Sequence, residues 1–261
     1  MKRFNDETVI CRCTGVTCGE IKKVFSPEKT LQQIIDETGA GAFCRKCVFD
    51  ISEYIDILKM QKEFYLRLLS KEELQAVYYE QMQEDFDARE LKSWETIAGF
   101  WDAGVCFAKG LFMGEAMMAY AVFFISASPY VLLDYFAVCK NARGKGIGSL
   151  FLQLIRKEES CDGLILEAES GYSSQTTEGI EICVRRLRFY HTNGAVSTPY
   201  ACELYGVELD ILYFPICSKP EASTIKNALN DIYIHMYREA YGKDVFLKDV
   251  RQRNIGYGQI K

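Results

Sequence analysis

Four cysteines near the N-terminus have the spacing of a ligand set. The pattern is Cys11-x-Cys13, thirty residues, and then Cys44-x-x-Cys47. Two tight pairs can present four thiolates to one centre, either a [2Fe–2S] cluster or a tetrahedral zinc ion. A Cys-x-Cys pair is unusual for structural zinc, where about two to four residues separate paired ligands. Four buried thiols without a metal are the remaining interpretation, but packing alone does not readily explain two such pairs.

The other cysteines are scattered. The chain has eleven cysteines, and five of them, including Cys18, lie in the first 47 residues. The N-terminal segment MKRFNDETVI lacks the apolar core of a signal peptide, so we expect a cytoplasmic, reducing location. There, such a count indicates metal ligands or buried thiols rather than disulfides. Cys18 falls outside the paired pattern and is expected to be an ordinary helix residue.

A glycine-rich segment, Arg143-Gly-Lys-Gly146-Ile-Gly148, follows a strand-like run and precedes an apolar helix that begins near Ser149. This order is a phosphate-binding arrangement, because glycines let backbone N–H groups approach a pyrophosphate and a helix N-terminus carries positive partial charge. The segment meets neither the G-x-G-x-x-G dinucleotide pattern nor the P-loop pattern. Taken alone, a glycine loop is a weak signal.

The elements that must position these residues differ along the chain. In the N-terminal part, capping boxes at Thr17/Glu20 and Thr30/Gln33 predict two short helices, and Gly39 suits the C-cap of the second. A third helix is expected over residues 47–57. From Phe64 onward, apolar runs predict strands at 64–68, 105–112, 117–125, 130–138, 164–168, 201–205 and 208–214. Helices are expected after the capping box at Ser70/Glu73 and at 94–103, 146–158, 178–191 and 222–241. In the helix at 178–191, one face is expected to carry Ile180, Val184, Leu187 and Tyr190 or His191.

This order of elements predicts an α/β (α+β) protein with a small helical module followed by a mixed sheet flanked by helices. The expected domains are 1–60, 61–217 and a C-terminal helical extension over 218–261. The longest uncharged run, 116–133, is interrupted by a Ser-Ala-Ser-Pro turn signal. It therefore predicts two buried strands rather than a membrane span.

Composition restricts the function classes. The 261 residues are 49% apolar and 26% charged, which is typical of a globular protein. A net charge of −5 and a pI of about 5.3 oppose broad nucleic-acid binding, which needs a basic face. The two histidines, His191 and His235, are too few for a histidine-rich metal site.

The N-terminal motifs resemble a known family. Cys11-Arg-Cys13-Thr-Gly-Val-Thr17, with Thr38-Gly-Ala-Gly41 and Cys44-x-x-Cys47, resembles the BFD-like [2Fe–2S] domain of the bacterioferritin-associated ferredoxin type, over about residues 8–57. The resemblance implies a small helical fold with a [2Fe–2S] cluster on Cys11, Cys13, Cys44 and Cys47. Many relatives have Gly directly after the third cysteine, whereas Arg45-Lys46 stands here. These charges either stabilise a reduced cluster or form a solvated surface pair.

The glycine loop matches Arg/Gln-x-x-Gly-x-Gly/Ala, the acetyl-CoA motif of the GNAT acetyltransferases. Leu164-Ile-Leu-Glu-Ala168 resembles that family's next strand, and Arg186 to Gly194, with Tyr190 four residues before the glycine, resembles its following helix. The resemblance covers about residues 63–217. Ala195 stands where relatives often carry Phe. The acetyl-CoA contacts that the resemblance implies are Phe136, Ala137, Val138, Arg143, Gly144, Lys145, Gly146, Ile147, Gly148 and Ser149.

The resemblance also implies catalytic roles. Tyr190 would protonate the departing CoA thiolate, since a phenol with a pKa of about 10 is protonated at neutral pH. Asp134 and Glu167 are candidates for the base that takes the proton of an amine, and either is equally explained as a strand-end charge. His191 points away from Tyr190 on helical geometry and is expected at the surface.

The sequence therefore predicts an N-acetyltransferase that uses acetyl-CoA and carries a [2Fe–2S] module of redox or regulatory role. The acceptor is a small-molecule or peptide amine whose identity the sequence does not reveal, a redox partner is possible, and neither nucleic acid nor membrane is expected as a partner. Two alternatives remain open: a non-enzymatic electron-transfer adaptor with an acyl-CoA-binding domain, and a zinc-stabilised acetyltransferase without a redox role.

Overall fold

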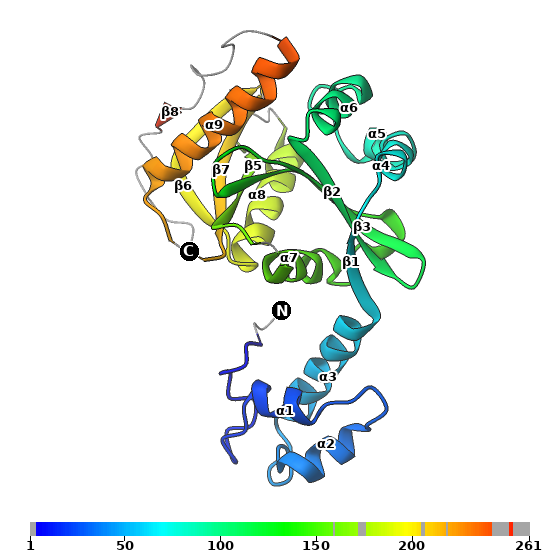
Figure 1. Ribbon diagram of the computed structural model, residues 1–261. Coiled ribbons are helices and arrows are strands. Elements are labelled where there is room, and N and C mark those ends of the chain that lie inside the picture. The colour runs from blue at the N-terminus through cyan, green and yellow to red at the C-terminus, as the bar shows by residue number, and fades with distance from the viewer. Residues whose placement is uncertain are drawn as a thin grey trace. The chain divides into compact units, whose positions relative to one another are not determined.

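The computed structural model describes residues 4–158, 160–171, 176–204, 207–217, 219–241 and 251–252. The chain divides into two compact units, Met1–Tyr65 and Leu66–Lys261 (Figure 1). The boundary expected at residues 60 and 61 lies a few residues earlier than this division. None of the described helices combines the length and the apolarity needed to cross a bilayer.

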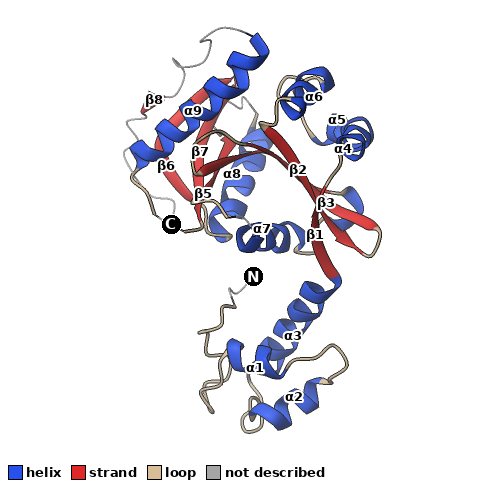
Figure 2. Cartoon of the chain, viewed as in Figure 1, coloured by secondary structure: helices blue, strands red, loops and turns tan. Residues whose placement is uncertain are grey.

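The first unit is helical. It contains α1 (Cys18–Val24), α2 (Leu31–Thr38) and α3 (Val48–Glu63) (Figure 2). Both capping boxes predicted from the sequence are formed, and Gly39 closes α2 with a φ of 73°. α3 extends beyond residue 57, because no Pro or Gly interrupts the segment that follows. Ile21, Ile34 and Ile51 are fully buried at the centre of this unit's core.

The second unit is built on a mixed sheet, which confirms the α/β prediction. The strands of the described chain are β1 (Phe64–Leu68), β2 (Cys106–Met113), β3 (Ala116–Phe124), β4 (Tyr130–Val138), β5 (Gly163–Glu169), β6 (Val196–Leu204), β7 (Val207–Pro215) and β8 (Arg251–Gln252). Their order in the sheet is β1-β2-β3-β4-β5-β7-β6-β8. The neighbours β4 and β5 run parallel, whereas β2–β3, β3–β4, β5–β7 and β6–β7 run antiparallel. The uncharged run 116–133 forms parts of β3 and β4, as predicted.

Helices cover both faces of the sheet (Figure 1). On one face lie α7 (Ile147–Glu158) and α8 (Thr177–Thr192), which contact β3, β4 and β5. The other face is covered by α4 (Lys71–Val77), a π-helical turn η1 (Tyr78–Met82), α5 (Gln83–Asp85), α6 (Trp94–Asp102) and α9 (Ala222–Tyr241). A short 3₁₀ turn, η2 (Lys140–Ala142), links β4 to the glycine loop. α9 packs against β4, β6 and α6, and thus within the larger unit.

The rotation of α8 decides between two alternatives that the sequence left open. Ile180, Val184 and Leu187 were expected on one face of the helix with either Tyr190 or His191. Ile180 and Val184 are 42% and 39% exposed, and His191 is exposed as well. The buried residues of α8 are Cys183 and Tyr190, which lie on the neighbouring face of the helix. The Tyr190 ring packs edge-on against Phe214 of β7, so the sheet surface beneath α8 sets the helix's rotation.

Candidate functional site

The central feature of the larger unit is a gap between two parallel strands. The ladder between β4 and β5 covers only Tyr130–Leu133 and Gly163–Leu166, although β4 continues to Val138 and β5 to Glu169. Beyond these residues the two strands are not hydrogen-bonded to each other, so a gap opens between their carboxyl ends. Such a gap admits a ligand to the middle of a sheet that is otherwise continuous.

A bulge in β4 sits at the point where the ladder ends. Leu133 pairs with Phe123 and Tyr135 pairs with Val122, so Asp134 is the extra residue. Leu132 and Tyr135 consequently both belong to the core on the α9 side of the sheet, which strict alternation would not allow. The bulge thus turns Asp134 and Tyr135 toward the segment that joins α5 to α6.

A buried ion pair holds that segment to the sheet. Lys92 Nζ donates to both carboxylate oxygens of Asp134, at 2.8 and 3.0 Å, and the two side chains are only 7% and 6% exposed. The Tyr135 hydroxyl accepts from the Lys92 N–H at 2.9 Å and donates to the Glu90 carbonyl at 3.0 Å. Because Asp134 is engaged by a buried ammonium, protonating it would leave that ammonium without its partner. Asp134 is therefore the weaker of the two base candidates.

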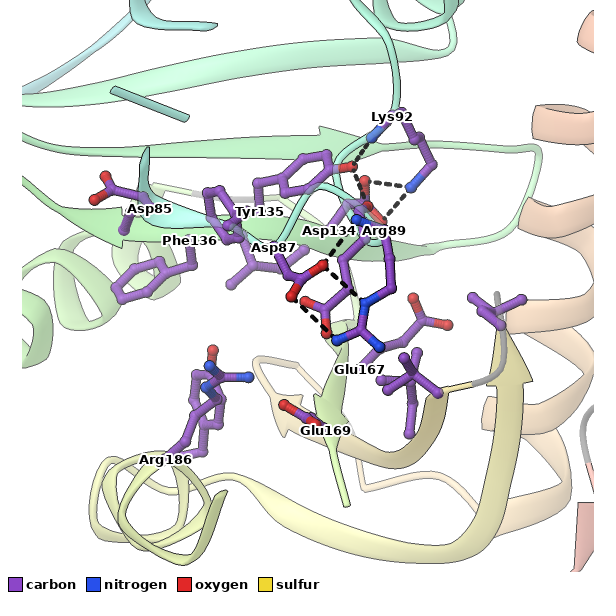
Figure 3. A pocket seen from close by; sticks show the side chains of 18 of the residues that line it. Asp85, Asp87, Arg89, Lys92, Asp134, Tyr135, Phe136, Glu167, Glu169 and Arg186 are labelled. Carbon is purple, nitrogen blue, oxygen red and sulfur yellow. Dashed lines mark hydrogen bonds and ion pairs between the residues drawn. The ribbon is translucent and has the colours of Figure 1, made fainter. Parts of the chain in front are cut away.

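Glu167 has a different environment (Figure 3). Burial and the nearby Asp134 together raise the pKa of its carboxyl to about 8, against the opposite effect of Lys92. The Cys202 thiol donates to Glu167 Oε1 at 3.6 Å, and the Tyr233 hydroxyl of α9 lies 3.5 Å from the same sulfur. A carboxyl with a pKa near neutrality is suited to exchange protons with a substrate.

Both Glu167 and Tyr190 line one cavity of about 550 Å³. The lining also takes residues from the gap itself, from the α5–α6 segment and from α8 (Figure 3). The residues that line it are Asp85, Phe86, Asp87, Arg89, Glu90, Lys92, Leu133, Asp134, Tyr135, Phe136, Ala137, Val138, Arg143, Glu167, Glu169, Arg186, Tyr190, Leu204, Val207 and Leu209. This size suits a small-molecule site.

Tyr190 lies on the α8 side of the cavity and is 8% exposed. Burial raises the pKa of its phenol, with Arg186 acting in the opposite direction, so the hydroxyl keeps its proton at neutral pH. His191 faces elsewhere: its Nδ1 lies 3.1 Å from the Ala195 carbonyl and its Nε2 lies 3.2 Å from Ser197 Oγ. His191 thus joins the end of α8 to β6 at the surface.

The glycine loop lies at the end of β4 and leads into α7. Gly144 and Gly146 have φ values of 76° and 77°, which side chains rarely adopt. A Cβ on Gly148 would lie 3.2 Å from the Phe189 ring and 3.3 Å from Val138, so this glycine allows α7 to approach α8 and β4 closely. The amides at the start of α7 have no partner one turn earlier in the helix and are the expected anion donors.

Of the predicted acetyl-CoA contacts, Phe136, Ala137, Val138 and Arg143 line the cavity. The others, Gly144 to Ser149, form the loop and first turn that follow. The Arg143 guanidinium donates to the Val138 carbonyl at 2.9 Å and pairs with Asp85, whose carboxylate also accepts from the Tyr120 hydroxyl at 2.8 Å. Arg143 therefore braces the loop against α5.

The four paired cysteines come together in the first unit. Cys13 Sγ and Cys44 Sγ are 3.2 Å apart, and the Cys11 thiol interacts with that of Cys47. Among the described residues, no group of three or more His, Cys, Asp or Glu side chains surrounds a point that would hold a single metal ion. Two pairs of thiols instead suit a cluster of two irons, in which each iron takes two cysteine ligands.

The backbone around Cys11 suits a two-iron cluster. The Gly41 N–H donates to Cys11 Sγ at 3.4 Å, and hydrogen bonds from Thr14 and Gly41 outweigh burial and lower the pKa of Cys11 to about 6. Gly41 has a φ of 78°, and a Cβ there would lie 3.0 Å from Val48. Cys18 is different: it is fully buried in α1, and burial raises its pKa to about 11. Arg45 and Lys46 are exposed beside Cys44.

Residues 9–57 match the BFD-like [2Fe-2S] binding domain family. This match confirms the resemblance seen in the paired cysteines and covers the first unit alone. A comparison with curated proteins found no match for the chain.

The larger unit has the GNAT acetyltransferase fold. A protein from Bacteroides thetaiotaomicron described as a GNAT-family acetyltransferase superposes with a TM-score of 0.54 at 15% identity, covering 69% of this chain and 99% of that one. The ribosomal-protein-S18-alanine N-acetyltransferase of Escherichia coli gives a TM-score of 0.43 at 16% identity, covering 60% and 97%. A GNAT-family protein from Desulfovibrio desulfuricans gives 0.45 at 15%, covering 59% and 99%. At 15% identity, the superposition on the Bacteroides protein establishes the fold of the larger unit and nothing finer.

Several site residues were not anticipated from the sequence. Lys92, Glu90 and Arg89 come from a charged stretch that carries no recognisable motif, and Cys202 and Tyr233 come from β6 and α9. The one available signal was the density of charge between residues 84 and 92, which suits an exposed loop equally well.

Proposed function

We propose that this protein transfers an acetyl group from acetyl-CoA to an amine. The observation that supports this best is the convergence of Glu167, Tyr190 and residues 136–138 on one cavity at the gap between β4 and β5. The glycine loop at the end of β4 would receive the pyrophosphate, and the thioester would lie along β4.

Each residue then has a step in the reaction. The amine nitrogen attacks the thioester carbonyl carbon, forming the C–N bond, and the C–S bond breaks. Glu167, ionised, accepts the proton that the amine loses, and Tyr190 donates its proton to the departing thiolate sulfur. The products are an N-acetylated amine and CoA with a free thiol. Lys92 pairs with Asp134 beside Glu167, and Asp134 raises the pKa of the Glu167 carboxyl, which favours proton uptake by Glu167.

The first unit is proposed to bind one [2Fe–2S] cluster through Cys11, Cys13, Cys44 and Cys47. The support is the match of residues 9–57 to a [2Fe-2S] binding family together with the two thiol pairs. When bound, such a cluster supplies one-electron transfer. The chain's own contribution is the Gly41 amide, which donates to a ligand sulfur.

The test combines binding and turnover. Calorimetry is expected to give stoichiometric binding of acetyl-CoA to the full chain, and a panel of amines is expected to release free CoA thiol together with an acetylated product identified by mass spectrometry. Absence of acetyl-CoA binding would rule out the proposal. Binding without transfer to any amine, in protein with a full complement of iron, would favour a non-enzymatic acyl-CoA-binding role.

A further inference from the structure

The two thiol pairs of the first unit differ in their access to solvent. Cys13 and Cys44 are exposed, whereas Cys11 and Cys47 are buried, with 2% and 8% of their surface accessible. Of the eleven cysteines, all of which lie in the described part of the chain, Cys217 is the one other exposed residue. A small oxidant in solution therefore reaches Cys13 and Cys44 directly and is kept from the buried pair.

The two exposed thiols also lie next to each other. Cys13 Sγ and Cys44 Sγ are 3.2 Å apart, although the residues are 31 positions apart in the chain. A disulfide bond is about 2.0 Å long, so the two sulfurs need to approach each other by only about 1 Å more. Sulfurs that hold iron are not free to form this bond. In a chain without iron, the fold itself holds the two thiols ready to react with each other.

Positive charge surrounds the exposed pair. The segments 8–19 and 38–49 carry all four paired cysteines, and their charged residues are Arg12, Arg45 and Lys46, with no Asp or Glu. These three side chains are exposed, in a chain whose net charge is −5. A local positive potential raises the concentration of an anionic oxidant, such as glutathione disulfide, at this surface.

We propose that Cys13 and Cys44 form a reversible disulfide when the first unit holds no iron, with a low-molecular-weight disulfide as the oxidant. The thiolate of one cysteine attacks a sulfur of the oxidant, which forms a mixed disulfide and releases one small thiol. The thiolate of the other cysteine then attacks the protein sulfur of that mixed disulfide, which forms the Cys13–Cys44 bond and releases the second small thiol. The two protein thiols are oxidised, the oxidant is reduced, and the two protons end on the released thiols.

The bond has a consequence for iron, which rests on the proposed cluster. It removes Cys13 and Cys44 from the expected ligand set, so the chain takes up no cluster until a thiol reductant opens the bond. Disulfides that are exposed to solvent are the ones that small thiols reduce readily. The exposed pair would thus act as a redox-controlled gate on cluster assembly, whereas the buried pair stays reduced.

The experiment treats the full chain, freed of iron with a chelator and reduced, with glutathione disulfide. Tryptic cleavage after lysine and arginine places Cys13 in the peptide 13–22 and Cys44 in the peptide 30–45, without the buried ligand cysteines. Mass spectrometry is expected to find these two peptides joined by a disulfide. Because Cys18 shares the first peptide, the digest is repeated in Cys18→Ala, which should give the same link.

A variant and an internal control test the pairing. Cys13→Ser should lose the linked peptides and retain glutathione on Cys44, because the thiol that displaces it is absent. Cys217, which is exposed in the larger unit, should retain glutathione as a mixed disulfide in every sample. As a second readout, the oxidised chain should incorporate at least about tenfold less iron than the reduced chain, and dithiothreitol should restore the uptake, since metals bind thiolates.

Glutathione on both Cys13 and Cys44 with no linked peptides would overturn the inference, and so would a link between other cysteines. Iron uptake that is undiminished in a chain carrying the bond would overturn the gate on cluster assembly. Failure of the proposed cluster has a different signature, in which the fully reduced chain takes up no iron while the linked peptides still form.

Discussion

Glu167 is the residue whose protonation should govern the rate. A base must be ionised before it accepts a proton, and the pKa of Glu167 is raised to about 8. We therefore expect kcat/KM to rise as the pH increases through about 8 and to level off above it. Glu167→Gln should remove this rise and lower kcat by roughly 10²- to 10⁴-fold. The pH profile should be measured with an amine of low pKa, so that the acceptor's own titration falls outside the range.

Cys202 provides a matched test of the same assignment. Its thiol donates to the Glu167 carboxylate and so lowers the pKa of that group. Cys202→Ala should move the midpoint of the profile to higher pH, whereas Cys217→Ala, at an exposed cysteine after β7, should not. An unchanged profile in Glu167→Gln would place proton uptake on another group or on water.

Tyr190→Phe removes one hydroxyl and keeps the ring that packs on Phe214. If the hydroxyl protonates the thiolate, kcat should fall by roughly 10- to 10⁴-fold, with little change in acetyl-CoA affinity. Tyr213→Phe serves as the control, because it removes a hydroxyl from a buried tyrosine of β7 outside the cavity. Unaltered turnover in Tyr190→Phe, when chemistry limits the rate, would leave water as the proton donor.

At the scale of elements, the β4–α7 connection is expected to control binding rather than chemistry. Gly146→Val forces a β-branched residue to a φ of 77° and places a side chain at the expected pyrophosphate position. Acetyl-CoA affinity should fall by at least about tenfold, and the backbone strain should cost roughly 1–2 kcal/mol of stability. Gly104→Val introduces similar strain after α6, at a φ of 71° with open space around it. Calorimetry should show normal binding in that variant, and equal losses in both would assign the effect to misfolding.

For the molecule as a whole, the first unit should carry iron. Anaerobically purified protein is expected to be reddish-brown, with about two irons and two sulfides per chain. Cys44→Ser should abolish the absorbance, whereas Cys18→Ala should keep it, since Cys18 is a fully buried residue of α1 that belongs to neither thiol pair. Stoichiometric zinc without iron, even after reconstitution, would favour the zinc-stabilised alternative.

The two units belong to one chain, so we also expect the cluster of the first unit to regulate acetyl transfer by the second. If the oxidised and reduced clusters favour different conformations, acetyl-CoA affinity or turnover should differ between them by about fivefold or more. Measurements on oxidised, dithionite-reduced and Cys44→Ser protein would show this. Equal values in all three would indicate an independent tethered unit.

The sequence by itself determined the features that depend on neighbouring residues. The capping boxes at Thr17 and Thr30 formed as predicted, because their hydrogen bonds join residues three apart. Strands β1 and β4 and helix α9 have the predicted bounds, and the cysteine pairs and glycine loop were recognisable as short motifs.

Only the tertiary structure decided which charges meet at the site. Asp134 and Glu167 were equivalent candidates in the sequence, and their difference arises from Lys92, which lies 42 residues before Asp134 and reaches it through a bulge. The sequence likewise left open whether Tyr190 or His191 shares a face of α8 with Ile180 and Val184, and packing of Tyr190 on β7 decides the rotation of the helix. Burial, pKa and pairing depend on contacts between distant segments, and no local pattern encodes those contacts.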